Sequence, residues 1–306
     1  GVSLTKGAFS NVVSGTDFTG ANVIAGNGSA GVSLSDPATH ANEVRYNYIG
    51  MSTAFVPLTN GGSGVVTFHA STNYIGPANY VGNNNGGAGI QITGTNGAGN
   101  VVFANVVGLD GAGNRRPNVN GIDVLDARDT QVGLPVLFGG NVIGGSSSDG
   151  VLVRGLAWNT KVQGNYIGAD VSGTVATTNI GSGVNDSAYH TQIGGPGLGN
   201  LISGNALNGV TIGGGEGAVV QGNYIGVNVS GTGPLSNRQY GVYVNNATNV
   251  VIGGTGTARN VISASRLSGL AVDGASSNVV VVGNYIGLNA TGTAAIPNGT
   301  AGVLVE

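Results

Sequence analysis

Asn223-Tyr224-Ile225-Gly226 is the stretch that decides the fold, because the chain repeats it. The same four residues occupy 47–50, 165–168 and 284–287, and a degenerate copy, Asn-Val-Val-Gly, occupies 105–108. Successive copies lie about 60 residues apart, and regular self-similarity at this scale indicates a stacked-repeat architecture. The chain therefore consists of about five copies of one unit.

The composition excludes several classes of protein. Hydrophobic residues make up 40% of the 306 residues, but no apolar run approaches the ~18 residues of a membrane span, so no membrane insertion is expected. The net charge is −3 and the basic residues are scattered, which predicts no nucleic-acid partner. The absence of cysteine excludes disulfides and thiolate metal sites. The chain begins with Gly and shows no signal peptide, which suggests a processed or trimmed chain.

Each unit divides into two coils of three short strands. A Gly-Val-x-Val segment (241–244) begins one coil, a second β-branched segment follows at 249–252, and a third follows at 260–263. Gly, Asn, Ser and Thr separate these runs, and nothing is long enough to predict a helix. The pattern predicts an all-β, right-handed parallel β-helix of about ten coils. We expect a single domain over 1–306, with repeats at about 1–63, 64–120, 121–182, 183–240 and 241–306.

A column of asparagines supports this prediction. One asparagine begins the third strand of every coil, and stacked amides can hydrogen-bond along such a column while tolerating a left-handed corner. We interpret the column as a structural ladder of Asn22, Asn47, Asn79, Asn105, Asn141, Asn165, Asn200, Asn223, Asn260 and Asn284.

The segments 200–205, 209–212 and 220–226 also resemble a known class. They are similar to right-handed parallel β-helix repeat proteins of the pectin-lyase-like superfamily, in particular bacterial exoprotein repeats of the NVISGN/GNYIG type. The resemblance covers essentially the whole chain and implies an extracellular or cell-surface bacterial protein. It implies an architecture rather than an activity, because one fold carries many functions.

Five loops of similar length follow the Asn-Tyr-Ile-Gly-type segments. They occupy 51–63, 109–120, 169–182, 227–240 and 288–301, and we expect them to form a ridge along the rod where function would lie. Calcium binding needs several oxygen ligands for each ion, yet two of the loops offer no carboxylate. Turn formation is therefore favoured over calcium, and no other cofactor or metal is predicted.

Acidic residues are densest near the middle of the chain. Asp123, Asp126 and Arg154 are the candidates to test for catalysis on a polysaccharide. A lyase could use such carboxylates with an arginine base, and a hydrolase would need two carboxyl groups flanking one bond. A solvated patch with some ion pairing is the favoured alternative. No pectate-lyase or polygalacturonase motif is present, so no catalytic residue is assigned and enzymatic activity is not the first expectation.

The tyrosines of the repeated segment are expected to pack in the core rather than to form an external sugar-binding strip. They share a column with valines and a leucine, namely Val23, Val142, Leu201 and Val261. Periodicity across a corner does not determine their direction.

The two ends of the chain carry the same type of strand. The chain opens on residues 1–4 and closes on residues 302–305 of one strand column, and neither end shows a capping segment. The first hypothesis is therefore an extracellular structural or adhesive rod, a surface or matrix component that assembles head to tail into filaments or continues into a longer chain. The alternatives are a polysaccharide lyase or hydrolase, or a glycan-binding module that uses the loop ridge.

Overall fold

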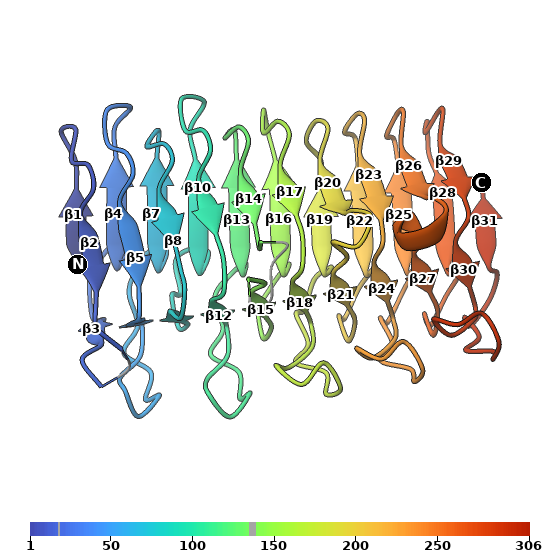
Figure 1. Cartoon of the computed structure of the whole chain (residues 1–306), viewed down its shortest axis with the longest axis horizontal. Helices are drawn as coiled ribbons and strands as arrows, with labels where there is room; N and C mark the ends of the chain where they lie inside the picture. The colour runs from blue at the N-terminus through green and yellow to red at the C-terminus, as the bar shows by residue number, and fades with distance from the viewer. Residues whose placement is uncertain (18, 135–138) are drawn as a thin grey trace.

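The chain forms a row of stacked coils, with the N terminus at one end and the C terminus at the other (Figure 1). The computed structural model describes residues 1–17, 19–134 and 139–306. Each strand pairs in parallel with its counterpart in the next coil, which confirms the predicted parallel β-helix. Within the described ranges, the helical element is a single 3₁₀ turn, η1 (Gly256–Ala258), and no helix is long and apolar enough to cross a membrane.

Three parallel sheets run the length of the rod. The first sheet contains β1 (Val2–Leu4), β4 (Val32–Ser35), β7 (Val65–Phe68), β10 (Ile90–Thr93), β13 (Ile122–Leu125), β16 (Val151–Arg154), β19 (Val184–Asp186), β22 (Val210–Gly213), β25 (Val242–Asn245), β28 (Leu270–Asp273) and β31 (Val303–Val305). The second contains β2 (Val12–Ser14), β5 (Glu43–Arg45), β8 (Tyr74–Ile75), β11 (Val101–Val102), β14 (Gln131–Val132), β17 (Lys161–Val162), β20 (Gln192–Gly194), β23 (Val219–Gln221), β26 (Val251–Gly253) and β29 (Val280–Val282). The third contains β3 (Asn22–Ile24), β6 (Asn47–Ile49), β9 (Tyr80–Val81), β12 (Val106–Val107), β15 (Val142–Ile143), β18 (Tyr166–Ile167), β21 (Leu201–Ile202), β24 (Tyr224–Ile225), β27 (Val261–Ile262) and β30 (Tyr285–Ile286).

The core follows from the alternation of side chains along each strand. In β10, Ile90 and Ile92 are fully buried inside the coil, while Gln91 and Thr93 face outward. The parallel register places Ile90 directly beside Ile122 of the next coil, so branched apolar side chains stack on similar side chains from coil to coil. Because the inward positions are filled in this way, any binding site must lie on the outer faces or at the corners.

The asparagine ladder is confirmed at the corner between the second and third sheets. Each amide nitrogen donates to the Oδ1 of the next asparagine, from Asn22 to Asn284, over distances of 2.8 to 3.1 Å. The same nitrogens also donate to backbone carbonyls, as Asn165 does to the carbonyl of Val132. The ladder thereby satisfies polar groups at a buried corner that the strand hydrogen bonds do not reach.

The other two corners carry ladders that the sequence prediction missed. At the corner between the first and second sheets, the ladder joins Asn11, Asn42, Asn73 and Asn100. At the corner where the chain passes to the next coil, one ladder joins Asn27, Asn60, Asn84 and Asn118, and another joins Asn179, Asn205 and Asn237. The five long loops leave from this last corner and project together on one side of the rod (Figure 1).

Candidate functional site

The structure brings Asp123 and Arg154 together on the outer face of the first sheet. Arg154 donates from Nε to Oδ1 of Asp123 at 3.1 Å and from Nη2 to Oδ2 at 3.0 Å. Gln91 donates to the same Oδ2 at 3.2 Å, and only 3% of Asp123 is exposed. The hydrogen bond to Asp123 raises the pKa of Arg154. The pair is a fixed two-point ion pair, and its catalytic role remains a prediction.

Asp126 lies at the corner between the first and second sheets, near enough to Arg154 for its charge to help raise the pKa of that arginine. It has a left-handed backbone, with φ of 61°, and its Oδ1 accepts a hydrogen bond of 2.8 Å from the backbone of Leu156. The structure gives it no hydrogen bond to Asp123. A hydrolase would need two carboxyl groups on either side of one glycosidic bond. The contacts of these two aspartates instead anchor an ion pair and a turn.

The Asp123–Arg154 pair allows a stability test. Arg154→Leu is expected to lower the free energy of unfolding by about 2 kcal/mol, because Asp123 stays buried after losing two charged hydrogen bonds. Arg45→Leu is the matched control, since its partner carboxylate, Glu43, is 44% exposed against 4% for Asp123, and this pair should be worth under about 0.5 kcal/mol. Urea unfolding measures both variants, and equal losses would contradict a structural role for the buried carboxylate of Asp123.

The five loops share one turn. Asn228 shows it most simply, because its Oδ1 accepts backbone hydrogen bonds from Thr232 at 3.1 Å and Gly233 at 3.2 Å. The matching acceptors in the other loops are Ser52, Asp110, Asp170 and Asn289. The predicted turns are therefore confirmed, and carboxylate, amide and hydroxyl oxygens serve the same purpose in them.

Two of these turns carry a carboxylate, which bears on the calcium prediction. Burial alone would raise the pKa of Asp110, but hydrogen bonds from Asn114 and Ala112 outweigh it and hold that pKa below its usual value. The pKa of Asp170 is lowered in the same way, with hydrogen bonds from Val175 and Ser172 outweighing burial. In the part of the chain that the structure describes, no three His, Asp or Glu side chains gather as metal ligands. Calcium binding remains an untested prediction.

Contrary to expectation, the repeated tyrosines do not point into the main core, although Tyr48 is buried. Ile49, Ile167 and Ile225 of the repeated segment are fully buried inside the coil, and the partly buried Ile286 packs against the same core, so the tyrosine that precedes each one faces outward. Tyr224 and Tyr285 pack against a small apolar cluster beneath the loops, separate from the main core. The tyrosines therefore lie on the outer face of the third sheet, between that sheet and the loops.

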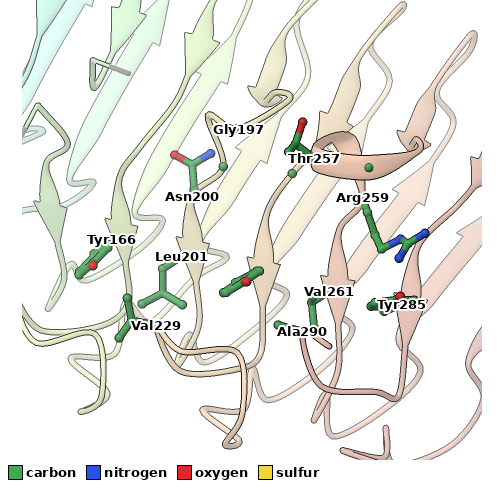
Figure 2. Close-up of a pocket in the computed structure, with 14 residues that line it drawn as sticks. Tyr166, Gly197, Asn200, Leu201, Val229, Thr257, Arg259, Val261, Tyr285 and Ala290 are labelled. Carbon is green, nitrogen blue, oxygen red and sulfur yellow. The ribbon is translucent and has the colours of Figure 1, made fainter. Parts of the chain in front are cut away.

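A groove runs along this face in the C-terminal half of the rod. We call it the tyrosine groove; it has a volume of about 460 Å³ and is lined by Tyr166, Tyr224, Tyr285, Leu201, Val261, Val229, Ala290, Asn200, Thr257, Arg259 and four glycines. Figure 2 shows Tyr166 and Tyr285 toward opposite ends, with Leu201 and Val261 between them. Because the tyrosines occupy alternate coils, they recur about every 9.6 Å along the rod.

One charged side chain lines the groove. The guanidinium of Arg259 lies 3.9 Å from the centroid of the Tyr285 ring, which is close enough for a cation–π contact. Its Nε donates to the carbonyl of Gly283 at 2.7 Å, and η1 precedes it directly in the chain. These contacts hold the cation against one wall of the groove.

The described lining lacks the pair of carboxyl groups that a polysaccharide hydrolase uses. The described lining offers phenol, hydroxyl and guanidinium groups but contains no Asp, Glu or His. A polysaccharide hydrolase needs a proton donor and a base at the scissile bond. Sequence reasoning missed this groove because its walls come from residues about 60 positions apart, which only the stacking of the coils brings together.

The same face is filled at the N-terminal end of the rod. A smaller hollow of about 160 Å³ lies over Val106 and Val142 and reaches Tyr80. Beyond it, the ring of Phe55 meets the rings of Tyr48 and Tyr80 edge-on, with centroids 5.6 Å and 5.0 Å away. The outer face of the third sheet is therefore open toward the C terminus and covered toward the N terminus.

Comparison with known proteins finds similarity in structure. No protein-family model and no curated protein sequence matches the chain. The A-module of mannuronan C-5 epimerase AlgE4 from Azotobacter vinelandii is 14% identical with a TM-score of 0.51, over 100% of this chain and 86% of that one. A double mutant of the periplasmic alginate epimerase AlgG is 14% identical with a TM-score of 0.55, over 96% and 75%. The Dettilon tailspike protein is 12% identical with a TM-score of 0.55, over 99% and 59%.

These similarities establish the fold, as the resemblance to pectin-lyase-like β-helix proteins implied. They also correct the first hypothesis about function. The matched proteins are epimerases and a tailspike, so the expectation of a structural or adhesive filament component is wrong, and the polysaccharide-acting alternative fits better. Uniform repeats suggested a filament, but one coiled scaffold carries proteins of several kinds, so the repeats alone do not indicate a filament.

Proposed function

We propose that this chain binds a linear polysaccharide lengthwise in the tyrosine groove, as a polysaccharide-acting protein or as its binding module. The observation that carries the proposal is the recurrence of Tyr166, Tyr224 and Tyr285 along one open groove. A polysaccharide is itself periodic, so a wall that repeats about every 9.6 Å offers the same contact to successive segments of the chain. Tyrosine suits such a ligand because its ring packs on apolar C–H faces while its hydroxyl meets polar groups.

The lining also indicates which polysaccharides to test. Leu201 and Val261 form an apolar floor, and Arg259 is the one cation of the described lining. A guanidinium pairs well with a carboxylate, so a sugar acid placed beside Arg259 would gain a charged hydrogen bond. A neutral chain can still use the tyrosines, and comparing acidic with neutral polysaccharides separates the two contributions.

The comparisons support a polysaccharide ligand and a location outside the cytoplasm. Two of the matched structures are named as epimerases of mannuronan and alginate, one of them periplasmic, and the third is a tailspike. A protein that binds polysaccharides in this way would act outside the cytoplasm, in a secreted or periplasmic form. Catalytic groups are not assigned, because the described lining of the groove holds no Asp, Glu or His.

Tyrosine substitutions test the proposal. Tyr224→Ala is expected to weaken binding by at least about tenfold, because it removes the central ring of the row. Tyr74→Ala is the control, since Tyr74 is 45% exposed on the outer face of the second sheet. Electrophoresis of the folded variants through gels containing alginate, polygalacturonate or xylan measures retardation, and circular dichroism confirms that both variants are folded.

Two results would overturn the proposal. One is that the wild-type protein migrates unretarded through every gel. The other is that retardation survives both Tyr224→Ala and deletion of loops 227–240 and 288–301, which contribute Val229 and Ala290 to the wall. Nuclear magnetic resonance of the incubated polysaccharides would show in the same experiment whether the protein alters them.

A further inference from the structure

Phe55 stands where the other four loops carry glycine. It is the fourth residue of its turn, counted from Ser52, and its φ is 59°. The corresponding residues of the other loops, Gly113, Gly173, Gly231 and Gly292, have φ between 66° and 81°. A left-handed backbone suits glycine and is unfavourable for a bulky side chain. An aromatic residue in this conformation must be held there by its surroundings.

The ring of Phe55 covers the tyrosines at the N-terminal end of the third sheet. Tyr48 and Tyr80 stack on each other with centroids 5.5 Å apart, and Phe55 lies edge-on against both. Only 7% of Tyr48 remains exposed, whereas Tyr80 stays partly exposed and lines the small hollow. In the later loops the glycine brings only backbone against the ring, as Gly231 does against Tyr224, and Tyr166, Tyr224 and Tyr285 keep enough free surface to line the groove.

The second loop makes room for this ring. A Cβ added at Gly111 would lie 3.0 Å from Cζ of Phe55, so a side chain at that position would press on the ring and require it to shift by a few tenths of an ångström. At the same place of the turn, the later loops carry Val171, Val229 and Ala290. The small residue therefore occurs in the loop that Phe55 reaches.

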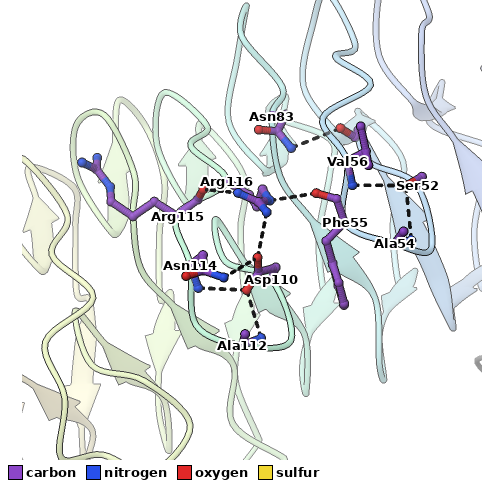
Figure 3. Close-up of polar contacts among 11 residues, drawn as sticks. Ser52, Ala54, Phe55, Val56, Asn83, Asp110, Ala112, Asn114, Arg115 and Arg116 are labelled. Carbon is purple, nitrogen blue, oxygen red and sulfur yellow. Dashed lines mark hydrogen bonds and ion pairs between the residues drawn. The ribbon is translucent and has the colours of Figure 1, made fainter.

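An ion pair holds the backbone of Phe55 in place (Figure 3). Arg116 donates from Nε to the carbonyl of Phe55 at 3.0 Å, and its Nη2 lies 2.8 Å from Oδ2 of Asp110. Asp110 is only 5% exposed and anchors the turn of the second loop. The first loop is thus fastened to the second at the residue that carries the covering ring.

We propose that Phe55 is a plug that closes the N-terminal end of the polysaccharide path and so sets the length of chain that the protein binds. The inference rests on the proposed function. The tyrosine groove reaches Tyr166, and the separate hollow over Val142 and Val106 lies farther along the third sheet and reaches Tyr80, against which Phe55 packs. Removing the plug would add the Tyr48–Tyr80 face to the path.

The plug itself is tested without any glycan. Phe55→Gly, which restores the residue of the other loops, is expected to increase nitration of Tyr48 and Tyr80 by tetranitromethane several-fold, as mass spectrometry would measure. Phe55→Leu keeps an apolar cover and should stay near the wild-type level. Phe9→Gly removes a 62% exposed ring in the turn between β1 and β2 and is the matched control. Unchanged nitration in a folded Phe55→Gly variant would overturn the plug.

Binding of alginate and xylan oligosaccharides of graded length then tests the path. Wild-type affinity should stop rising beyond a certain length, and for Phe55→Gly the rise should continue to longer oligosaccharides, with a gain of about tenfold for the longest. Equal length dependence in both proteins, with nitration increased, would overturn the inference while leaving the proposed function intact. Absence of binding by both proteins would instead overturn the proposed function, and the inference with it.

Discussion

Asn165→Ala is expected to lower the free energy of unfolding by about 4 kcal/mol, because it breaks the ladder at a buried position from both sides. Oδ1 of Asn165 accepts from the backbone nitrogen and from Nδ2 of Asn141, both at 2.9 Å. Its Nδ2 donates to Oδ1 of Asn200 at 3.0 Å and to the carbonyl of Val132 at 2.9 Å. The alanine would leave these groups buried without their partners.

Asn22→Ala is the matched control for this prediction. Asn22 is exposed at the N-terminal end of the same ladder, where its amide donates to Asn47 at 2.8 Å. The loss there should be below about 1 kcal/mol. Urea unfolding combined with amide hydrogen exchange suits a repeat protein, because stacked coils can open in segments. Equal losses at both positions would contradict the view that buried amide contacts stabilise the corner.

Asn165→Asp separates hydrogen bonding from side-chain volume. The carboxylate keeps the shape and the acceptor of the amide but faces the carbonyls of Val132 and Gln163 and Oδ1 of Asn200 without a donor. A buried charge against three acceptors is unfavourable. The aspartate variant should therefore be at least as unstable as the alanine variant at neutral pH. A smaller loss for the aspartate would show that volume, rather than hydrogen bonding, sets the cost.

Much of the fold could be predicted from the sequence because the same strand and corner residues recur in every coil. An asparagine equivalent to Asn223 recurs at the start of the third strand in each coil, so the corner between the second and third sheets could be located residue by residue. The first corner was missed because its ladder changes composition. Asn73 and Asn100 give way to Thr130 and Thr160 at the same position before the second strand, so no single residue type marks the corner along the whole chain.

The site was harder to predict for physical reasons. The third-sheet strand of Tyr166 and Ile167 is only two residues long, so alternation has too few positions to reveal which residue faces in. The groove depends on neighbours about 60 residues apart in sequence. The position of Phe55 could have been found from the sequence. Aligning the five turns on their first residue places Phe55 opposite four glycines.

Asp186 places a carboxyl group inside the core, and we expect its titration to have a large effect on the free energy of unfolding. The parallel register puts it in the inward column between Val153 and Ile212, and it is fully buried. Oδ1 accepts hydrogen bonds from Thr191 at 2.8 Å and from the backbone of Ala188 at 3.2 Å. In the described structure, Oδ2 has no hydrogen-bond partner. Burial therefore raises the pKa of Asp186 from 3.8 to about 6, although both hydrogen bonds oppose the rise.

The sign of the pH dependence follows from this raised pKa. Below about pH 4 the carboxyl is protonated in both the folded and the unfolded chain, so its titration adds no cost to folding. As the pH rises to about 6, the unfolded chain releases the proton first and is favoured. The free energy of unfolding should therefore fall across this window and then level off. The loss above the folded pKa is about 3 kcal/mol for the rise from 3.8 to about 6.

Asp186→Asn should remove this loss, because an amide has the shape of the protonated acid and does not titrate. Its oxygen can still accept from Thr191 and Ala188. At pH 8 the variant should be more stable than the wild type by about 3 kcal/mol, and near pH 4 the two should converge. Subtracting the two urea-unfolding curves across this range isolates Asp186 from the other carboxyls, which titrate alike in both proteins. A flat difference, or a less stable variant at pH 8, would mean that the carboxylate finds a partner in solution which offsets its burial.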